Sequence, residues 1–281
     1  MIEVRLGDNL EVLRGIPDRW FDLVYIDPPF NTGRVRSQTQ ISTTRDADGD
    51  RTGFQGRRYR TTKLGTARYA DAFDDYPGFL EPRLREVRRV LASEGSLFVH
   101  LDYREVHHVK VLLDGIFGRD CFQNEIIWAY DYGARSTKRW PAKHDNILWY
   151  SRHPTNYTFR RDEADRIPYM APGLVGADKA ARGKTPTDTW WHTIVSPTGR
   201  EKTGYPTQKP VGMLERIVKV HSKPGMRLGD FFAGSGSFGD AADRHGRDVV
   251  LIDSNPEAID VMRRRFAGRV AQFPPPLARL A

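Results

Sequence analysis

The sequence predicts an α/β fold in which an open, mostly parallel sheet carries helices on both faces. Short apolar runs typical of buried strands alternate with segments of helical periodicity, an order that is characteristic of parallel sheets. The clearest strands are 21–26 and 248–253, and the clearest helix is 77–92, whose apolar residues recur near the 3.6-residue period. With 281 residues, the chain can form one large domain that contains an insertion.

The expected elements follow one another with few interruptions. The first half is expected to hold strands at 2–6, 21–26 and 96–101, and helices that begin near 10, span 77–92 and end at Gly118. The second half is expected to hold β-like runs at 124–130 and 146–150, a helix from Pro210, strands at 226–232 and 248–253, and a last helix from Pro256 to Phe266.

Two segments without clear periodicity interrupt this order and carry the excess positive charge. Residues 31–70, expected to be a loop because of their five glycines, hold nine Lys/Arg and three Asp, a net charge of +6. Residues 131–205 hold thirteen Lys/Arg and eight Asp/Glu, a net charge of +5. The chain as a whole carries +8, so the remainder sums to −3 (8 − 11). Basic segments of this kind indicate a phosphate backbone as partner, although ordinary solvated loops have the same composition.

Composition excludes several classes of protein. No run of about 18 apolar residues is present, so no membrane span is expected, and the N-terminus lacks the apolar core of a secretory signal. The single cysteine, Cys121, excludes an internal disulfide, and no metal site is expected because His107 and His108 have no ligand partners at useful spacing. A cytoplasmic protein is expected.

The segment Asp27-Pro28-Pro29-Phe30 stands directly after the apolar run 21–26. It places a carboxylate, prolyl carbonyls and an aromatic ring at one strand end, where open α/β sheets bind ligands. Two acceptors would hold both N–H bonds of an exocyclic amine on a nucleobase and localise its lone pair, while Phe30 stacks on the ring. The segment therefore indicates methylation of a base amine. The alternative is a structural Pro-Pro turn with Phe30 in the core.

A glycine-rich turn follows a later strand and has the spacing Gly234-x-Gly236-x-x-Gly239, with Asp253 nineteen residues after Gly234 (253 − 234). This pattern matches a dinucleotide fingerprint, in which the acid binds ribose hydroxyls. Only one strand and one helix follow Gly239, which is too little for the usual nicotinamide domain. The pattern also suits a nucleoside that carries a methionine tail.

With these two motifs in this order, the chain resembles the permuted (beta-class) amino-methyltransferases of DNA, close to the modification methylases of restriction–modification systems. The resemblance assigns the target amine to Asp27, Pro28, Pro29 and Phe30, and S-adenosylmethionine to Asp8, Asp27, Lys209, Asp230, Phe232, Gly234, Gly236 and Asp253. In this family the acid at the position of Asp8 approaches the adenine ring, and the acid at the position of Asp253 binds the ribose. Lys209 stands in Thr207-Gln208-Lys209-Pro210, which is similar to a further cofactor motif. Gly229 and Phe231, on either side of Asp230, depart from the family pattern.

The resemblance implies a Rossmann-like, seven-stranded S-adenosylmethionine-dependent methyltransferase fold that is circularly permuted. It implies a catalytic half at 1–130 with a mobile basic loop at 31–70, a target-recognition insertion at 131–205, and a cofactor-binding half at 206–281. The basic loop is the candidate for closing over the flipped base.

The function that this implies is site-specific methylation of double-stranded DNA at the N6 amine of a flipped-out adenine. Asp27 favours adenine, because enzymes acting on N4 of cytosine more often have serine there. N4-cytosine methylation on the same scaffold remains an alternative, as do an RNA or protein amine as substrate and a catalytically silent DNA-binding protein. A homodimer and a cognate restriction nuclease are further partners that the resemblance leaves open.

Overall fold

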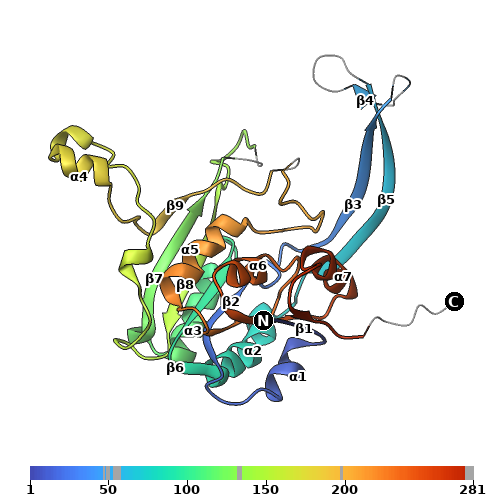
Figure 1. Cartoon of the computed structure of the whole chain (residues 1–281). Helices are drawn as coiled ribbons and strands as arrows, with labels where there is room; N and C mark the ends of the chain where they lie inside the picture. Colours follow the sequence, from blue (N-terminus) through green and yellow to red (C-terminus); the bar gives the residue numbers. More distant parts are fainter. Residues whose placement is uncertain (47, 49–50, 53–57, 132–134, 197–198, 276–281) are drawn as a thin grey trace. The chain divides into compact units, whose positions relative to one another are not determined.

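The computed structural model describes residues 1–46, 48, 51–52, 58–131, 135–196 and 199–275. The chain divides into two compact units, one formed by Met1–Phe30 with Asp75–Ala281 and the other by Asn31–Asp74 (Figure 1). Each unit is described by itself.

The larger unit is built on one nine-stranded sheet with the strand order β12-β1-β11-β10-β2-β6-β8-β7-β9. The strands from β12 to β6 in this order are parallel, β8 is antiparallel to both of its neighbours, and β9 is parallel to β7. The bounds are β1 Ile2–Leu6, β2 Phe21–Ile26, β6 Leu91–Leu101, β7 Phe122–Ala129, β8 His144–Ser151, β9 Thr189–Trp191, β10 Arg227–Asp230, β11 Asp248–Asp253 and β12 Ala271–Gln272. The expected sheet of seven strands is thus present, with the short strands β9 and β12 added at its edges.

The helices of this unit pack in two groups. One group joins α1 (Asn9–Arg14), α2 (Tyr76–Val90) and α3 (Val106–Phe117). The other contains α5 (Val211–His221), α6 (Ser237–Arg244) and α7 (Pro256–Arg265) (Figure 1). Buried side chains of these three helices share one apolar core with the sheet. A short helix, α4 (Ala177–Arg182), and the 3₁₀ turns η2 (Arg119–Cys121), η3 (Arg161–Glu163) and η4 (Pro172–Leu174) lie in the connections.

Local signals fix the ends of several helices. Asp75 accepts a hydrogen bond from the backbone N–H of Gly78 at 2.9 Å and so begins α2, and Asn255 does the same for Glu257 at the start of α7. Gly118 ends α3 with φ +94°, which a residue with a side chain adopts only with strain. The expected end of this helix at Gly118 is confirmed.

The smaller unit corrects the expectation of a loop at 31–70. Strands β3 (Arg34–Arg45) and β5 (Arg58–Asp71) form an antiparallel ribbon, with the short strand β4 (Arg51–Thr52) paired to β5. The prediction of a loop relied on glycines and on the lack of apolar alternation. A narrow ribbon does not require a buried face, so that pattern gives no signal, whereas the many threonines of these strands do favour β-structure.

The interval 131–205 is the predicted target-recognition insertion, and the β-like run expected at 146–150 lies inside it. It contains β8, which pairs with β6 and β7 inside the main sheet, and it belongs to the same compact unit as that sheet. The additional chain is therefore the β7–β8 connection and the stretch from 152 to 205. Its role in target recognition stays a prediction. Over the described ranges, no helix is both long and apolar enough to cross a membrane, and no cluster of His, Cys, Asp and Glu could hold a metal ion.

Candidate active site

Three carboxylates meet at one edge of the larger unit's sheet. Asp27 follows β2, Asp230 ends β10, and Asp253 ends β11. These strands are adjacent and parallel, in the order β11-β10-β2, so their carboxyl ends lie at the same edge. The sequence predicted all three side chains as site residues, and the sheet order brings them together at the edge where α/β folds bind ligands.

Asp27 is held from one side only. The amine of Lys209 lies 2.5 Å from its Oδ2 atom, and the two side chains are 8% and 16% exposed. The other oxygen, Oδ1, is buried and has no hydrogen-bond partner among the described residues. The Lys209 amine also lies 4.7 Å from the centre of the Phe30 ring. One oxygen of Asp27 is therefore fixed, and the other remains available to a donor.

The two prolines of the motif differ in their surroundings. The Pro29 carbonyl accepts a hydrogen bond of 2.6 Å from the hydroxyl of Tyr76 at the start of α2. Pro28 is buried beside it. Because proline has no N–H, neither residue can donate a backbone hydrogen bond to the carbonyls of this turn.

A buried polar chain lies behind Phe30. The Phe30 ring stacks on His100, with a centroid distance of 5.9 Å and an interplanar angle of 28°. His100 Nδ1 lies 2.8 Å from the Tyr25 hydroxyl, and His100 Nε2 lies 3.1 Å from Oδ2 of Asp145. The hydroxyl of Tyr130 donates to Oδ1 of the same carboxylate at 3.1 Å.

This chain has a defined direction. A carboxylate only accepts hydrogen bonds, so His100 Nε2 carries a proton and donates it to Asp145. Burial raises the pKa of Asp145, but the hydrogen bonds from His100 and Tyr130 and the electrostatic interactions with His100 and Lys209 outweigh burial and hold that pKa below its usual value. Sequence reasoning missed this chain; its only signal was a histidine inside the apolar run 96–101.

The pKa values of the carboxyls of Asp230 and Asp253 are raised. Burial raises the pKa of Asp230 well above its usual value, and the negative charges of Asp27 and Asp253 add to this effect. Burial also raises the pKa of Asp253, although the backbone N–H groups of Asn255 and Gly234 donate to it at 2.8 and 2.7 Å. Three carboxyl groups therefore lie close together here, and burial disfavours the ionised form of Asp230 and of Asp253, while the positive charge of Lys209 lowers the pKa of Asp230.

The backbone conformation of the glycine-rich turn requires glycine at two positions. Gly234 and Gly236 have φ values of +49° and +73°. A Cβ atom on Gly236 would lie 2.9 Å from Met262 Cγ, and one on Gly239 would lie 2.5 Å from Leu251 Cδ1. The third glycine thus allows close packing of α6 on β11, as its place in the motif predicts.

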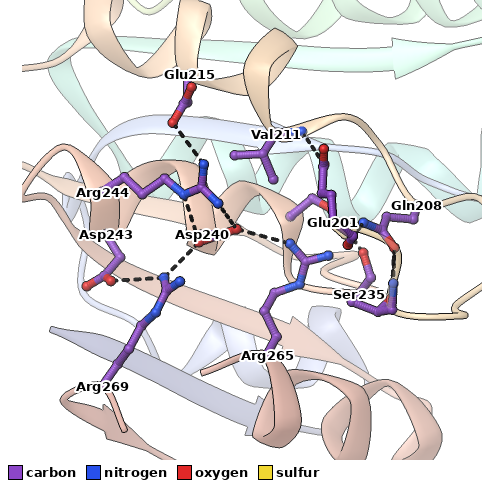
Figure 2. A network of polar contacts seen from close by, with 12 residues as sticks. Glu201, Gln208, Val211, Glu215, Ser235, Asp240, Asp243, Arg244, Arg265 and Arg269 are labelled. Carbon is purple, nitrogen blue, oxygen red and sulfur yellow. Dashed lines mark hydrogen bonds and ion pairs between the residues drawn. The ribbon is translucent and has the colours of Figure 1, made fainter. Parts of the chain in front are cut away.

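The segment that carries Lys209 is braced by its neighbours (Figure 2). Gln208 donates to the Glu201 carbonyl at 2.8 Å and accepts from the Thr203 backbone N–H at 2.9 Å, while Glu201 Oε1 accepts from the N–H of Val211 at 2.7 Å. Lys209 is thereby fixed just before α5. A second cluster in Figure 2 surrounds the Asp240 carboxylate of α6 with the side chains of Arg244, Arg265 and Arg269.

Asp8 and Phe232 lie at the margin of the site. Asp8 caps α1 by accepting from the Leu10 N–H at 2.9 Å, and it pairs with Arg83 at 2.7 Å with its side chain half exposed. The Phe232 ring lies 6.3 Å from that of Phe79. These contacts are structural, and a contact of either residue with the cofactor stays a prediction.

Residues 21–264 match a protein-family model described as DNA methylase. The chain belongs to this family of DNA methylases. The methylase is 26% identical to the type II methyltransferase M.HpaI of Haemophilus parainfluenzae, over 92% of the chain and 72% of that protein. It is 27% identical to the DNA adenine methyltransferase YhdJ of Escherichia coli (strain K12), over 92% of the chain and 81% of that protein.

Solved structures of low sequence identity share the fold of the methylase. The M1.HpyAVI–SAM complex superposes with a TM-score of 0.61 at 18% identity, covering 95% of this chain and 100% of that one. The PvuII DNA methyltransferase, described as cytosine-N4-specific, gives a TM-score of 0.63 at 16% identity, covering 95% and 87%. The expected methyltransferase fold and the class of DNA methyltransferase are confirmed, and the nicotinamide enzyme is excluded. The base that is methylated is not decided by these similarities.

Proposed function

We propose that this methylase transfers the methyl group of S-adenosylmethionine to the N6 amine of an adenine flipped out of double-stranded DNA. The observation that carries the proposal is the Oδ1 atom of Asp27 after β2, which is buried and has no hydrogen-bond partner in the part of the chain that the structure describes. Leaving a buried acceptor unsatisfied costs about 1–3 kcal/mol, so a donor that reaches this oxygen is favoured.

The amine is held by two acceptors. Asp27 Oδ1 accepts one N–H, because Lys209 already occupies Oδ2. The second acceptor is the carbonyl of Pro28, since Tyr76 already donates to the carbonyl of Pro29. Acceptors at both N–H bonds raise the electron density on the nitrogen and aim its lone pair at the methyl donor, which makes the nitrogen a better nucleophile.

The charge of the site fits the cofactor. Asp27, Asp230 and Asp253 converge on one sheet edge, and Lys209 pairs with only one of them. S-adenosylmethionine carries a sulfonium and an ammonium group, which this negative environment stabilises. Asp253 would accept hydrogen bonds from the ribose hydroxyls. The lone pairs of its carboxylate that do not bind the N–H groups of Gly234 and Asn255 are available for this. Asp8 and Phe232 flank the adenine end, and the Gly234–Gly236 turn allows close approach of the backbone.

The bound cofactor supplies an electrophilic methyl group on sulfur. Attack by the adenine nitrogen on this methyl group would form the new N–C bond as the S–C bond breaks, and the remainder of the cofactor would be a neutral thioether. The methylated amine is then positively charged and acidic, so Asp27 Oδ1 accepts its proton and passes it to water. Asp27 serves first as an orienting acceptor and then as a weak base. Phe30, backed by His100, stacks on the base.

Double-stranded DNA is the substrate that the charge of the chain favours. A base inside a duplex cannot reach a strand-end carboxylate, so it is flipped out at a cost of a few kcal/mol. The type II methyltransferases among the relatives support a role in restriction–modification. A cognate nuclease and a homodimer stay predictions.

N4 of cytosine is the second candidate, because a cytosine-N4 enzyme has the same fold. Mass spectrometry of nucleosides from DNA treated with the methylase and S-adenosylmethionine distinguishes the two. N6-methyladenine is the expected product. N4-methylcytosine would retain the mechanism at Asp27 and overturn the choice of base, and the absence of both from a genomic DNA substrate would contradict the proposed function.

A further inference from the structure

The connection between β7 and β8 exposes an unusual side chain. Trp140 is 95% exposed, the highest value among the six tryptophans of the chain. Trp128, Trp149 and Trp190 are buried, Trp20 lies under the guanidinium of Arg227, and Trp191 is 71% exposed. Exposing an indole forgoes the stabilisation that its burial would provide. A single exposed apolar residue is common, so the surroundings of Trp140 decide what it means.

Those surroundings are basic and polar. Arg135, Lys138 and Arg139 are all exposed, and none of them has a side-chain hydrogen bond or ion pair among the described residues. The hydroxyl of Ser136 accepts hydrogen bonds of 3.2 Å from the backbone N–H groups of both Lys138 and Arg139, which defines a local turn before Trp140. Residues 135–139 line a concavity of the surface.

The base of this connection is tied to the catalytic motif. The Tyr130 N–H donates to the Lys143 carbonyl at 2.9 Å, and the Tyr130 hydroxyl bonds Asp145 at 3.1 Å. Asp145 bonds His100, which stacks on Phe30. Trp140 is five residues before Asp145 (145 − 140), a length of chain that spans at most about 18 Å. Trp140 is therefore within reach of a duplex whose flipped base stacks on Phe30.

We propose that Trp140 inserts into the duplex beside the flipped base and fills the space that the base leaves, while Arg135, Lys138 and Arg139 contact the flanking phosphates. Apolar and aromatic wedges that unstack a base step are a known way for proteins to distort DNA, and base–aromatic stacking does not depend on sequence. This inference rests on the proposed function, because it requires a flipped base.

The phosphate contacts are tested by salt dependence. Replacing Lys138 and Arg139 by alanine is expected to lower the slope of log K against log salt by about 0.9 for each phosphate that the variant no longer neutralises. Lys223→Ala is the matched control. Lys223 is exposed and precedes β10, so it lies at the amino ends of the parallel strands, opposite the ends that carry the candidate active site. A double variant with an unchanged slope would overturn the phosphate contacts.

The wedge is tested with two duplexes that contain the site methylated by the wild-type enzyme. In one duplex the target base is correctly paired, and in the other it is mismatched, which lowers the cost of flipping. Trp140→Ala is expected to lower kcat/KM about tenfold or more on the paired duplex, and less than about threefold on the mismatched one. Trp140→Phe should retain most of the activity on both.

Met170→Ala is the matched control, because Met170 is an equally exposed apolar side chain in the same interval and has no place in the proposed contact. It should behave as the wild type on both duplexes. Equal losses for Trp140→Ala on the two duplexes, or no loss on either, would overturn the wedge. Failure of the wild-type enzyme to methylate any DNA would instead overturn the proposed function, so the two failures are distinguishable.

Discussion

The amine of Lys209 lies 2.5 Å from Oδ2 of Asp27, although 182 residues separate them in the chain. The pairing leaves Oδ1 of the same carboxylate buried and without a partner among the described residues. A lysine from the segment before α5 thus selects which oxygen of Asp27 is available to substrate. One oxygen of Asp27 thus pairs with Lys209 and the other can bind substrate. The first two predictions test these two roles.

Asp27→Ala is expected to lower the rate of methyl transfer by at least about 100-fold, because the amine loses the acceptor that orients it. Cofactor binding should change little, since Asp230, Asp253 and the glycine turn remain. Transfer of labelled methyl groups to DNA measures the first effect, and calorimetric titration with S-adenosylmethionine measures the second. Substantial remaining activity would contradict the role given to Asp27.

Lys209→Met is expected to lower kcat about 10-fold or more, because Asp27 then has no fixed orientation and the negative charge of the site is uncompensated. Lys202→Met is the matched control: Lys202 is exposed in the same segment and should give wild-type rates. Steady-state kinetics with DNA compare the two variants. Equal activity of both would show that Lys209 does not position Asp27.

Gly236→Ala is expected to destabilise the fold by about 2–4 kcal/mol and to weaken cofactor binding. The new Cβ would require a residue with a side chain at φ +73° and would lie 2.9 Å from Met262 Cγ. Gly246→Ala measures the cost of the backbone conformation alone. Gly246 has φ +70°, and no described atom lies within 4 Å of the position of a Cβ. Urea unfolding and cofactor titration should find a smaller loss of stability and normal affinity for Gly246→Ala. Identical behaviour of the two variants would refute a requirement for close packing at Gly236.

His221 is expected to make stability dependent on pH. Burial lowers the pKa of His221 to about 3, although a hydrogen bond with the backbone of Thr158 opposes this. The ring packs against Trp149, with a centroid distance of 4.4 Å, and against Phe98 at 4.8 Å. The unfolded chain, with an ordinary histidine pKa near 6.5, therefore binds one more proton than the folded chain between these two values.

The stability that neutral His221 provides is thus fully present above about pH 6.5 and is lost as the pH falls toward 3, by up to about 1.4 kcal/mol per pH unit. Urea unfolding at several pH values from 7 to 5 should give a shallower dependence for His221→Leu than for the wild type. His107→Gln removes an exposed histidine and should leave the dependence unchanged. An equal slope for wild type and His221→Leu would contradict the assignment.

The main sheet and its helices were predictable because their signals are local. The buried run 21–26, the strand at 248–253 and the helix ended by Gly118 each show a pattern within a few residues. The ribbon of β3 and β5 was missed because its strands show no apolar alternation. The run 146–150 was expected to be β-like and is β8, but its antiparallel pairing with both β6 and β7 depends on the sheet rather than on its own sequence.

The candidate site likewise contains residues with a local sequence signal and residues without one. The positions of Asp27 and Asp253 were predictable because each stands at the end of an expected strand, whereas Asp230 lies inside the expected strand 226–232 and was assigned by the resemblance. The chain from Tyr25 through His100 to Asp145 was not predictable, because a histidine in an apolar run gives no indication of which side chains will face it across the sheet.

The sequence by itself determined the class of fold, the two strand-end motifs and therefore the kind of chemistry, because each depends on residues that are neighbours in the chain. Only the tertiary structure decided that Lys209 takes Oδ2 of Asp27, that Tyr76 takes the Pro29 carbonyl, and that Trp140 remains exposed. These relationships depend on strand order, register and packing between distant segments. Such contacts leave no periodic trace in the sequence, since they are set by the free energy of the whole fold.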